Sequence, residues 1–432
     1  MLSKPNILVV GAGYVGLATA VHLAAKKFQV TVTEKNHATV DSLKRGKLHF
    51  REPGLAQAFK RTIDAKRLNP VLPSKNIFEE ADLIFIAIDS VDRSDWRMRL
   101  TAFERMANWI GGSKRRTPPT IVLKSTNVVG FADQFRSLLD QTPYGARVRL
   151  VVNPEFLREG SAYQDTAKPW RIIIGRHHKR DATRLLDLYR RVYPKSIPIV
   201  QTDLKSAELI KLASNVYLAH RLAFIHEITD FARMEQLDIT SIQQGIGQDK
   251  RIGLDYFTPG LGFGGSCLPK DCRLINSAEG ESGFTFETAL TAMNINDRLL
   301  EYLMANLKYH LGSLKGKKIA ILGAAFKPEI DDVRGSQAVK LANHLRRAGA
   351  KVNVYEPFLP HTKKIIKGDI PLVHNLDEAL KGASAFVIGT AHQQFARLQP
   401  NHSAKLMKKR IGVDYFGILN RKKWEKTGFE IV

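Results

Sequence analysis

Near its amino terminus the chain reads Ile7-Leu8-Val9-Val10-Gly11-Ala12-Gly13-Tyr14-Val15-Gly16. The four apolar residues predict a short, buried parallel strand. The G-x-G-x-x-G turn that follows opens a helical pattern through Lys27, and a second strand, Val30-Thr31-Val32-Thr33, ends at Glu34. This order of strand, glycine turn, helix, strand and acid predicts a dinucleotide-binding βαβ unit.

The glycine turn and the acid have separate tasks in such a unit. The glycines permit a tight turn and a close approach to pyrophosphate, whose charge the start of the helix stabilises. Glu34 can accept both ribose hydroxyls and would repel a 2′-phosphate, which favours NAD over NADP, although the neighbouring Lys35 works against that preference. The expected cofactor contacts are Gly11, Gly13, Tyr14, Val15, Gly16, Glu34 and Lys35.

Strands and helices alternate along the rest of the chain. The next predicted strands lie at 83–88, 121–124, 150–152 and 172–174, which indicates an open, doubly wound sheet. From Thr202 to Met234 a helical pattern runs without Gly or Pro, which predicts a long helix that joins two domains and often forms a dimer surface.

A second α/β unit begins at Lys317. Its predicted elements are strands at 319–322, 352–355, 386–388 and 411–413 and a helix at 335–347. The turn after the first of these strands has one glycine only, so this half need not bind a dinucleotide.

The composition bounds the class of protein. The chain has 432 residues, 44% of them hydrophobic and 25% charged, which is typical of a globular protein with two to four domains. Two cysteines suit a reducing compartment, so we expect a cytoplasmic protein. No apolar run reaches the length of a membrane span, and glycines interrupt the amino-terminal run that could otherwise pass for a signal peptide.

The net charge of +24 is high. Nucleic acid, an acidic membrane surface or an anionic small substrate would each be a reason for it. The basic residues are scattered apart from short clusters at 114–116 and 408–410, and the sequence has no zinc-finger spacing and no aromatic set of an RNA-recognition motif. We therefore favour a basic solvated surface, and we expect no membrane partner, no nucleic-acid partner and no metal.

The strongest chemical signal lies in Gly262-Phe263-Gly264-Gly265-Ser266-Cys267-Leu268-Pro269-Lys270-Asp271. Glycines before Cys267 let the backbone approach a ligand closely. A thiolate is a strong nucleophile, and its pKa falls beside cations or a helix start. The alternative is a small buried cysteine without chemistry, as most free cysteines are.

Two further groups of residues fit a reaction centre. Lys211 and Asn215 share one face of the long helix and could hold a developing oxyanion; alternatively, they are a solvated lysine beside a buried asparagine. The segments 124–126 and 153–160 follow strands of the first sheet, and ligands of such sheets bind beyond the carboxyl ends of the strands.

These motifs occur together in one known family. In chain order they are Gly11–Gly16, Glu52-Pro53-Gly54-Leu55, Lys124-Ser125-Thr126, Asn153–Gly160, Thr202-Asp203, Ser206-Ala207-Glu208, Lys211, Asn215, Arg251-Ile252-Gly253, the Cys267 segment, Phe326-Lys327 and Asp331-Asp332-Val333-Arg334. Over nearly its whole length the chain resembles the nucleotide-sugar 6-dehydrogenases, the family of UDP-glucose and GDP-mannose 6-dehydrogenases, and it is most similar to the UDP-glucose branch.

The resemblance implies an α/β fold of two Rossmann-like, doubly wound domains, joined by a long central helix and a helical dimerisation core. We place the NAD-binding domain at 1–200, the central dimerisation and catalytic domain at 201–312 and the UDP-sugar-binding domain at 313–432. The implied reaction is the NAD-dependent oxidation of the C6 alcohol of UDP-glucose to UDP-glucuronate by a homodimer, with release of two NADH. An aldehyde has no good hydride to give until a nucleophile adds, so Cys267 would form a thiohemiacetal and then a thioester.

The resemblance assigns roles by position. Lys211 and Asn215 would stabilise oxyanions, Asp271 would act as base with a water held by Thr126, and Glu155 would assist thioester hydrolysis. The implied catalytic residues are therefore Cys267, Lys211, Asp271, Asn215, Glu155 and Thr126. The implied cofactor contacts add Ser125, Thr126, Glu159 and Arg334. The implied substrate contacts are Glu155, Phe156, Leu157, Arg158, Lys211, Asn215, Arg251, Phe257, Gly260, Phe263, Gly264, Phe326 and Lys327.

The sequence departs from the family pattern at four places. They are Asp89-Ser90-Val91 for Gly-Thr-Pro, Asn127-Val128 for Val-Pro, Arg334-Gly335-Ser336 for Arg-Glu-Ser, and Asp414-Tyr415-Phe416-Gly417 for Asp-Gly-Arg-Asn. At the last of these, an arginine that would grip substrate is not evident.

Three alternatives remain open at this point. One is a GDP-mannose or another nucleotide-sugar 6-dehydrogenase. The second is a single-step β-hydroxyacid dehydrogenase, which resembles this fold and does not need Cys267. The third is a nucleotide-sensing or nucleic-acid-binding protein on the same scaffold.

Overall fold

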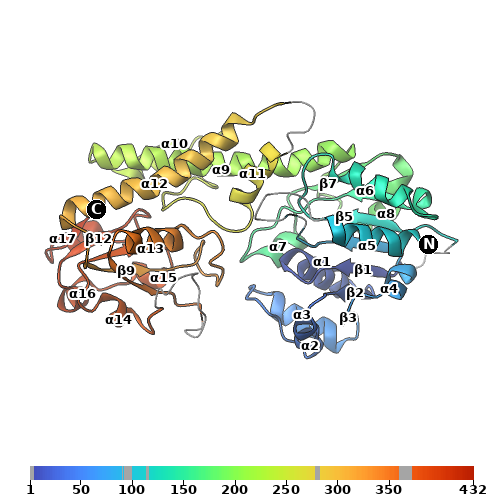
Figure 1. Ribbon diagram of the computed structural model, residues 1–432, viewed down its shortest axis with the longest axis horizontal. Helices are drawn as coiled ribbons and strands as arrows, with labels where there is room; N and C mark the ends of the chain where they lie inside the picture. Colours follow the sequence, from blue (N-terminus) through green and yellow to red (C-terminus); the bar gives the residue numbers. More distant parts are fainter. Residues whose placement is uncertain (1–3, 90, 92–99, 113–115, 278–282, 360–371) are drawn as a thin grey trace. The chain divides into compact units, whose positions relative to one another are not determined.

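The computed structural model describes residues 4–89, 91, 100–112, 116–277, 283–359 and 372–432. Contacts divide the chain into two compact units, which are treated one at a time (Figure 1). The first unit comprises residues 1–213 and 277–283, and the second comprises residues 214–276 and 284–432.

The first unit is built on an eight-stranded sheet with the order β3-β2-β1-β4-β5-β6-β7-β8. Its strands are β1 (Ile7–Val10), β2 (Val30–Thr33), β3 (Leu68–Val71), β4 (Leu83–Ile86), β5 (Thr120–Leu123), β6 (Arg149–Val152), β7 (Ile172–Arg176) and β8 (Ile199–Thr202). Neighbouring strands pair in parallel, except that β7 runs antiparallel to β6. The predicted doubly wound sheet is confirmed, whereas β3, β8 and the reversal of β7 were not predicted.

Apolar residues fill a core on each face of this sheet. The helices of the unit are α1 (Tyr14–Ala25), α2 (His37–Lys44), α3 (Leu55–Asp64), α4 (Lys75–Glu80), α5 (Leu100–Gly111), α6 (Phe131–Asp140), α7 (Ala162–Ala167) and α8 (Thr183–Val192). Val9 packs with residues of α1, α3 and α8, while its neighbour Leu8 packs with residues of α5 and α6. Adjacent residues of a strand point to opposite faces, so the uninterrupted run Ile7–Val10 contributes to both cores.

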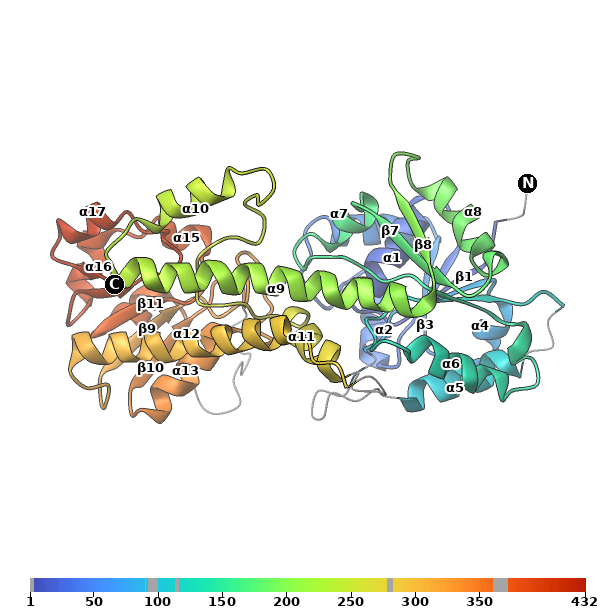
Figure 2. The same ribbon diagram turned by 90° about the horizontal axis from the view of Figure 1, so that it is seen from above.

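Helix α9 (Leu204–Met234) begins in the first unit and ends in the second. It confirms the predicted long helix, and Figure 2 shows it as one uninterrupted element. Within the second unit it pairs with α12 (Glu287–Leu311), where Arg298 Nη2 lies 2.9 Å from Glu227 Oε1. In the part of the chain that the structure describes, no helix has both the length and the apolar character needed to cross a membrane.

The second unit holds a five-stranded parallel sheet with the order β10-β9-β11-β12-β13. Its strands are β9 (Lys318–Leu322), β10 (Lys351–Tyr355), β11 (Ala385–Ile388), β12 (Ile411–Val413) and β13 (Glu430–Ile431). Its other helices are α10 (Ile239–Gly247), α11 (Leu268–Ser277), α13 (Gln337–Arg347), α14 (Leu376–Leu380), α15 (Gln393–Ala396), α16 (Pro400–Leu406) and α17 (Arg421–Glu425). The four strands and the helix predicted for this half are confirmed, and β13 adds an edge strand.

Candidate functional site

The first glycine turn is open where a dinucleotide would lie. Gly11 has a φ of +101°, and a Cβ on Gly16 would lie 1.9 Å from the carbonyl oxygen of Gly11. A Cβ on Gly13, in contrast, would meet nothing within 4 Å, and no side chain caps the helix α1 that begins next to it. A free helix start beside open space fits the pyrophosphate of NAD.

We expect two glycine variants to separate packing from cofactor binding. Gly16→Ala should destabilise the first unit by about 3 kcal/mol, because its methyl group collides with backbone that cannot move aside. Gly13→Ala should leave the urea midpoint unchanged and weaken NAD binding about tenfold, roughly 1.4 kcal/mol. Urea unfolding and NAD titration of both variants check this, and equal NAD affinity in Gly13→Ala and wild type would contradict it.

The acid after β2 lies beside the same turn. Glu34 Oε2 accepts from the backbone N–H of Ala12 at 3.3 Å, and Oε1 accepts from that of Asn36 at 3.1 Å. The Tyr14 ring contacts the Phe50 ring at a tilt, with ring centroids 4.0 Å apart, while Lys35 is exposed. The predicted cofactor residues at this strand end are therefore grouped, and Glu34 is held at the edge of the turn.

The corresponding turn of the second unit is filled by its own side chains. Glu356 is fully buried and accepts from the backbone N–H groups of Ala324 and Ala325 at 2.7 and 2.9 Å. His392 Nε2 lies 3.2 Å from the same carboxylate. Burial alone would raise the pKa of Glu356, but His392 and the two N–H groups hold it below its ordinary value. This turn is occupied from within, which agrees with the prediction that the second half need not bind a dinucleotide.

A buried charge cluster follows strands β5 and β6 of the first unit. Lys211 Nζ lies 3.0 Å from Glu155 Oε1, and the side chains of the two residues are only 3% and 8% exposed. Glu155 Oε2 also accepts from the backbone N–H of Leu157 at 2.6 Å. Burial would raise the pKa of Glu155, but Lys211, the Leu157 N–H and the nearby Lys124 hold it below its ordinary value. Glu155 is therefore an ionised carboxylate in a water-poor setting.

Phe156 lies beside this cluster as an aromatic surface for cations. The Arg171 guanidinium is 4.0 Å from its ring centroid, and Lys211 Nζ is 5.3 Å from it. Both separations fall within the range of cation–π attraction. The predicted residues Glu155, Phe156 and Lys211 are thus brought together, and Leu157 contributes its backbone.

The cysteine segment lies wholly in the second unit. Cys267 is half-buried and directly precedes α11, and the Asp271 N–H donates to the Cys267 carbonyl at 2.8 Å. Asp271 is fully buried, accepts from Asn215 Nδ2 at 2.5 Å and is also paired with Lys270. The helix start favours a thiolate at Cys267, and the Asp271 carboxylate one turn further on is paired with Lys270 and Asn215.

The glycines before Cys267 have internal packing partners. A Cβ on Gly264 would lie 2.4 Å from the carbonyl oxygen of Gly335, and a Cβ on Gly265 would lie 2.7 Å from the Phe326 ring. Phe263 exchanges backbone bonds with the Asn296 side chain at 2.6 and 3.1 Å. We had attributed these glycines to the approach of a ligand; the structure gives them backbone and ring neighbours of the same unit.

Several other predicted residues are engaged locally. Arg158 pairs with Asp165 at 2.7 Å, and Arg334 with Asp332, Nε to Oδ2, at 2.7 Å. Arg251 is 89% exposed and paired with Asp249. The remaining predicted positions lie in the described chain as follows: Phe257 is buried and stacks on Phe224, Gly260 faces Phe416, Ser125 donates to the Ile88 carbonyl at 2.6 Å, and Val15, Thr126, Glu159 and Lys327 are half-buried.

The structure describes the surroundings of several residues that depart from the family pattern. Ser90 lies outside the described residues, while Val91 is buried and Asp89 is exposed. Asn127 is buried, and neither polar atom of its side chain has a partner among the described residues. In the second unit Arg233, from α9, lies 3.8 Å from the Tyr415 ring and donates to the Asp414 carbonyl. An arginine therefore reaches this loop, although the loop itself carries none.

Further hydrogen bonds hold the strand ends at the site, and among the residues that make them Tyr189 and Glu52 were not predicted as site residues. Lys124 and Tyr189 both donate to Asn153, and Glu52 accepts from the N–H groups of Gly160 and Ala162. The available signal was that Lys124 and Asn153 follow neighbouring strands. Glu52 carried no chemical signal of its own, because its partners lie more than a hundred residues away.

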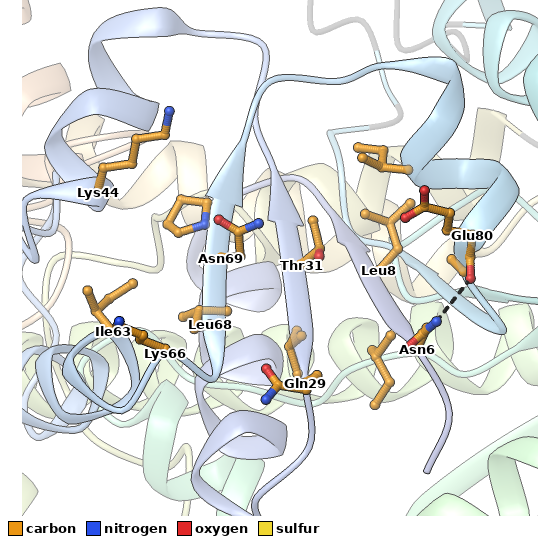
Figure 3. A pocket seen from close by; sticks show the side chains of 15 residues that line it. Asn6, Leu8, Gln29, Thr31, Lys44, Ile63, Lys66, Leu68, Asn69 and Glu80 are labelled. Carbon is orange, nitrogen blue, oxygen red and sulfur yellow. Dashed lines mark hydrogen bonds between the residues drawn. The ribbon is translucent and has the colours of Figure 1, made fainter. Parts of the chain in front are cut away.

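A separate hollow of about 540 Å³ opens on the first sheet (Figure 3). Its polar lining residues lie on β2 and β3, just before β1, β2 and β3, and at the ends of α2 and α4: Asn6, Gln29, Thr31, Lys44, Lys66, Asn69 and Glu80. Among the described lining residues there is no cysteine or histidine and none of the predicted site residues. The hollow is therefore not a candidate for the chemistry.

Three segments of the chain match, in order, the three domains of one family. Residues 5–193 match the NAD binding domain of the UDP-glucose/GDP-mannose dehydrogenase family, residues 205–298 its central domain and residues 320–421 its UDP binding domain.

Individual relatives match over most of their length. UDP-glucose 6-dehydrogenase YwqF of Bacillus subtilis is 35% identical over 387 residues, 89% of this chain and 87% of that protein. UDP-glucose 6-dehydrogenase of Rhizobium meliloti is 32% identical over 429 residues, 98% of each chain. The solved UDP-glucose dehydrogenase of Pyrobaculum islandicum has a TM-score of 0.89 at 33% identity, with 98% of this chain and 96% of that chain covered.

Proposed function

The chain belongs to the UDP-glucose/GDP-mannose dehydrogenase family, as its motifs predicted, and we propose that it oxidises C6 of UDP-glucose to the carboxylate of UDP-glucuronate. It is an oxidoreductase with the NAD-binding domain of that family. The observation that carries the proposal is the buried Asp271–Asn215 pair one helical turn from Cys267. The UDP-glucose dehydrogenases among its relatives support this choice of substrate.

The proposed first oxidation needs a base and an oxyanion site. Asp271, with a water on Thr126, accepts the proton of the C6 hydroxyl, while Lys211 and Asn215 stabilise the developing charge on oxygen. NAD, when bound, supplies the acceptor for the hydride that leaves C6, once in each oxidation step.

The proposed second oxidation depends on Cys267. Its thiolate adds to the C6 aldehyde, which forms a C–S bond and an oxyanion that Lys211 holds. Loss of the second hydride leaves a thioester. Glu155 then accepts a proton from the attacking water, the C–S bond breaks, and the products are the free thiolate and the carboxylate.

The test is a stoichiometric assay of purified protein. We expect UDP-glucose to give two NADH per molecule, followed by absorbance, with UDP-glucuronate as the product by mass spectrometry. GDP-mannose and UDP-N-acetylmannosamine serve as parallel substrates. No turnover of UDP-glucose together with turnover of another sugar nucleotide would overturn the proposed substrate.

We also propose that two copies associate through α9. Tyr217, Phe224 and Phe231 are seven residues apart on this helix, so they share one face, and their exposed fractions are 59%, 45% and 59%. Such a stripe of exposed aromatic residues is typical of an interface between proteins. The ranges 1–200, 201–312 and 313–432 remain our proposed domains, with this surface in the middle one.

Charged substitutions on the stripe test the dimer. The double variant Tyr217→Glu/Phe231→Glu should elute at the mass of one chain, because burying two carboxylates in an apolar interface is unfavourable. Light scattering after gel filtration measures the mass. Lys195→Glu, an exposed position of the first unit, is the matched control and should elute as a dimer. A monomeric wild type would contradict the proposal.

A further inference from the structure

Lys124 links the ends of two neighbouring strands. It follows β5, and Asn153 follows β6, which pairs with β5 in parallel. Lys124 Nζ donates to Asn153 Oδ1 at 3.0 Å and to the Asn153 carbonyl at 3.3 Å. The second contact fixes the peptide between Asn153 and Pro154. Glu155 is the residue directly after Pro154.

Asn153 is held by hydrogen bonds of both its backbone and its side chain. Its backbone N–H donates to the Leu123 carbonyl at 2.9 Å, and its Nδ2 donates to the Ile173 carbonyl at 2.7 Å. The Tyr189 hydroxyl donates to its Oδ1 at 2.5 Å. Burial raises the pKa of Tyr189 well above its ordinary value, so this hydroxyl stays a neutral donor. Glu155 therefore extends from a backbone that has little freedom to turn.

The charges around Glu155 do not balance. Lys211, from α9, and Lys124, from the end of β5, both face this one carboxylate. Burial lowers the pKa of Lys124 to about 8, Glu155 opposes that change, and Lys211 adds to it. Lys124 is thus a second cation beside one carboxylate, and its two hydrogen bonds to Asn153 place it next to the backbone that carries Glu155.

We infer that Lys124 is a positioning residue: it fixes the Asn153–Pro154 peptide and thereby holds the Glu155 carboxylate against Lys211. The inference rests on the proposed function, in which Glu155 assists the hydrolysis of the thioester. Lys124 acts through Glu155 in this account, so its removal matters only while Glu155 is present.

A double-mutant cycle tests this dependence. We expect Lys124→Met to lower kcat about 10- to 100-fold, because a misplaced catalytic group can reduce the rate by up to that factor. The KM for UDP-glucose should change less than about threefold. In the Glu155→Gln background the same substitution should cause no further loss. Multiplying losses in the double variant would show that Lys124 acts independently of Glu155 and would overturn the inference.

Two further variants separate positioning from general stability. Tyr189→Phe removes the other donor to Asn153 Oδ1 and should lower kcat less than Lys124→Met, since the bond to the Asn153 carbonyl remains. Lys195→Met, at an exposed position, should leave kcat unchanged. Lys124→Met could also lose kcat only because its thermal midpoint is lowered. Full recovery of kcat at lower temperature would show this and would overturn the inference.

A crystal structure of Lys124→Met separates this inference from the proposed function. We expect the Glu155 Oε1 to Lys211 Nζ distance to exceed 4 Å there, compared with 3.0 Å in the wild type. An unchanged distance would overturn the positioning role, whatever the substrate is. A wild type that oxidises none of the sugar nucleotides would overturn the proposed function while leaving this structural outcome to decide the role of Lys124.

Discussion

Replacing Cys267 by serine is expected to reduce the formation of UDP-glucuronate at least about 10³-fold, the scale of losses when a catalytic nucleophile is removed. A serine hydroxyl is not ionised near neutral pH, so it adds poorly to the aldehyde and gives an oxygen adduct that leaves slowly. Rapid-quench experiments should therefore show no more than one NADH per active site before the reaction stops. The wild type should give two NADH per substrate.

The second cysteine is the matched control. Cys272 is buried five residues further along, and burial, with the charge of Asp271, raises the pKa of its thiol to about 12. Cys272→Ala should keep the rate and the stoichiometry and lose about 1 kcal/mol of stability through a small cavity. A Cys267→Ser variant with wild-type turnover would favour a single-step dehydrogenase over the proposed covalent mechanism.

Replacing Lys211 by methionine should lower kcat about 10²- to 10³-fold, because the oxyanion loses its main charged donor. The same change should destabilise the first unit by about 3 kcal/mol at neutral pH, since it removes the direct partner of the buried Glu155. Urea unfolding followed by fluorescence, together with steady-state kinetics, measures both effects.

The stability loss should depend on pH in a defined direction. The pKa of Glu155 lies below its unfolded value, so the pair contributes fully above about pH 4.5 and loses its contribution as the pH falls through the folded pKa. The difference between Lys211→Met and wild type should therefore be largest near pH 7 and shrink in acid. Lys205→Met, on the same helix with an exposed partner 3.6 Å away, should change stability by less than about 0.5 kcal/mol. Equal losses at both positions would contradict the account.

In the first sheet, burial separates the strands that the sequence predicted from those that it did not. Strands such as β1 and β4 are apolar throughout, because both faces are covered, and the sequence predicted them. Strand β3 contains an asparagine and a proline on an edge, and the edge strand β8 is half exposed, so neither carried a clear pattern. The reversal of β7 is decided by its pairing with β6, which its own run of isoleucines cannot reveal.

The residue types proposed for the chemistry are visible in the sequence, whereas the contacts that hold them are not. Cys267, Asp271, Lys211 and Glu155 stood out because their residue types suit acid–base and nucleophilic work. The contacts that hold them join distant parts of the chain, such as Lys124 to Asn153 and Asn215 to Asp271. The glycines before Cys267 illustrate the same limit, because their neighbours Phe326 and Gly335 lie some sixty to seventy residues further on.

The buried Glu356 carboxylate affects how many dinucleotides the chain can bind and how a second binding site could be engineered. It already occupies the backbone amides that a second pyrophosphate would need, so an equilibrium titration should saturate at one dinucleotide for each polypeptide. To make this turn of the second unit bind a nucleotide, Glu356 would have to be replaced before any glycine is added to the turn.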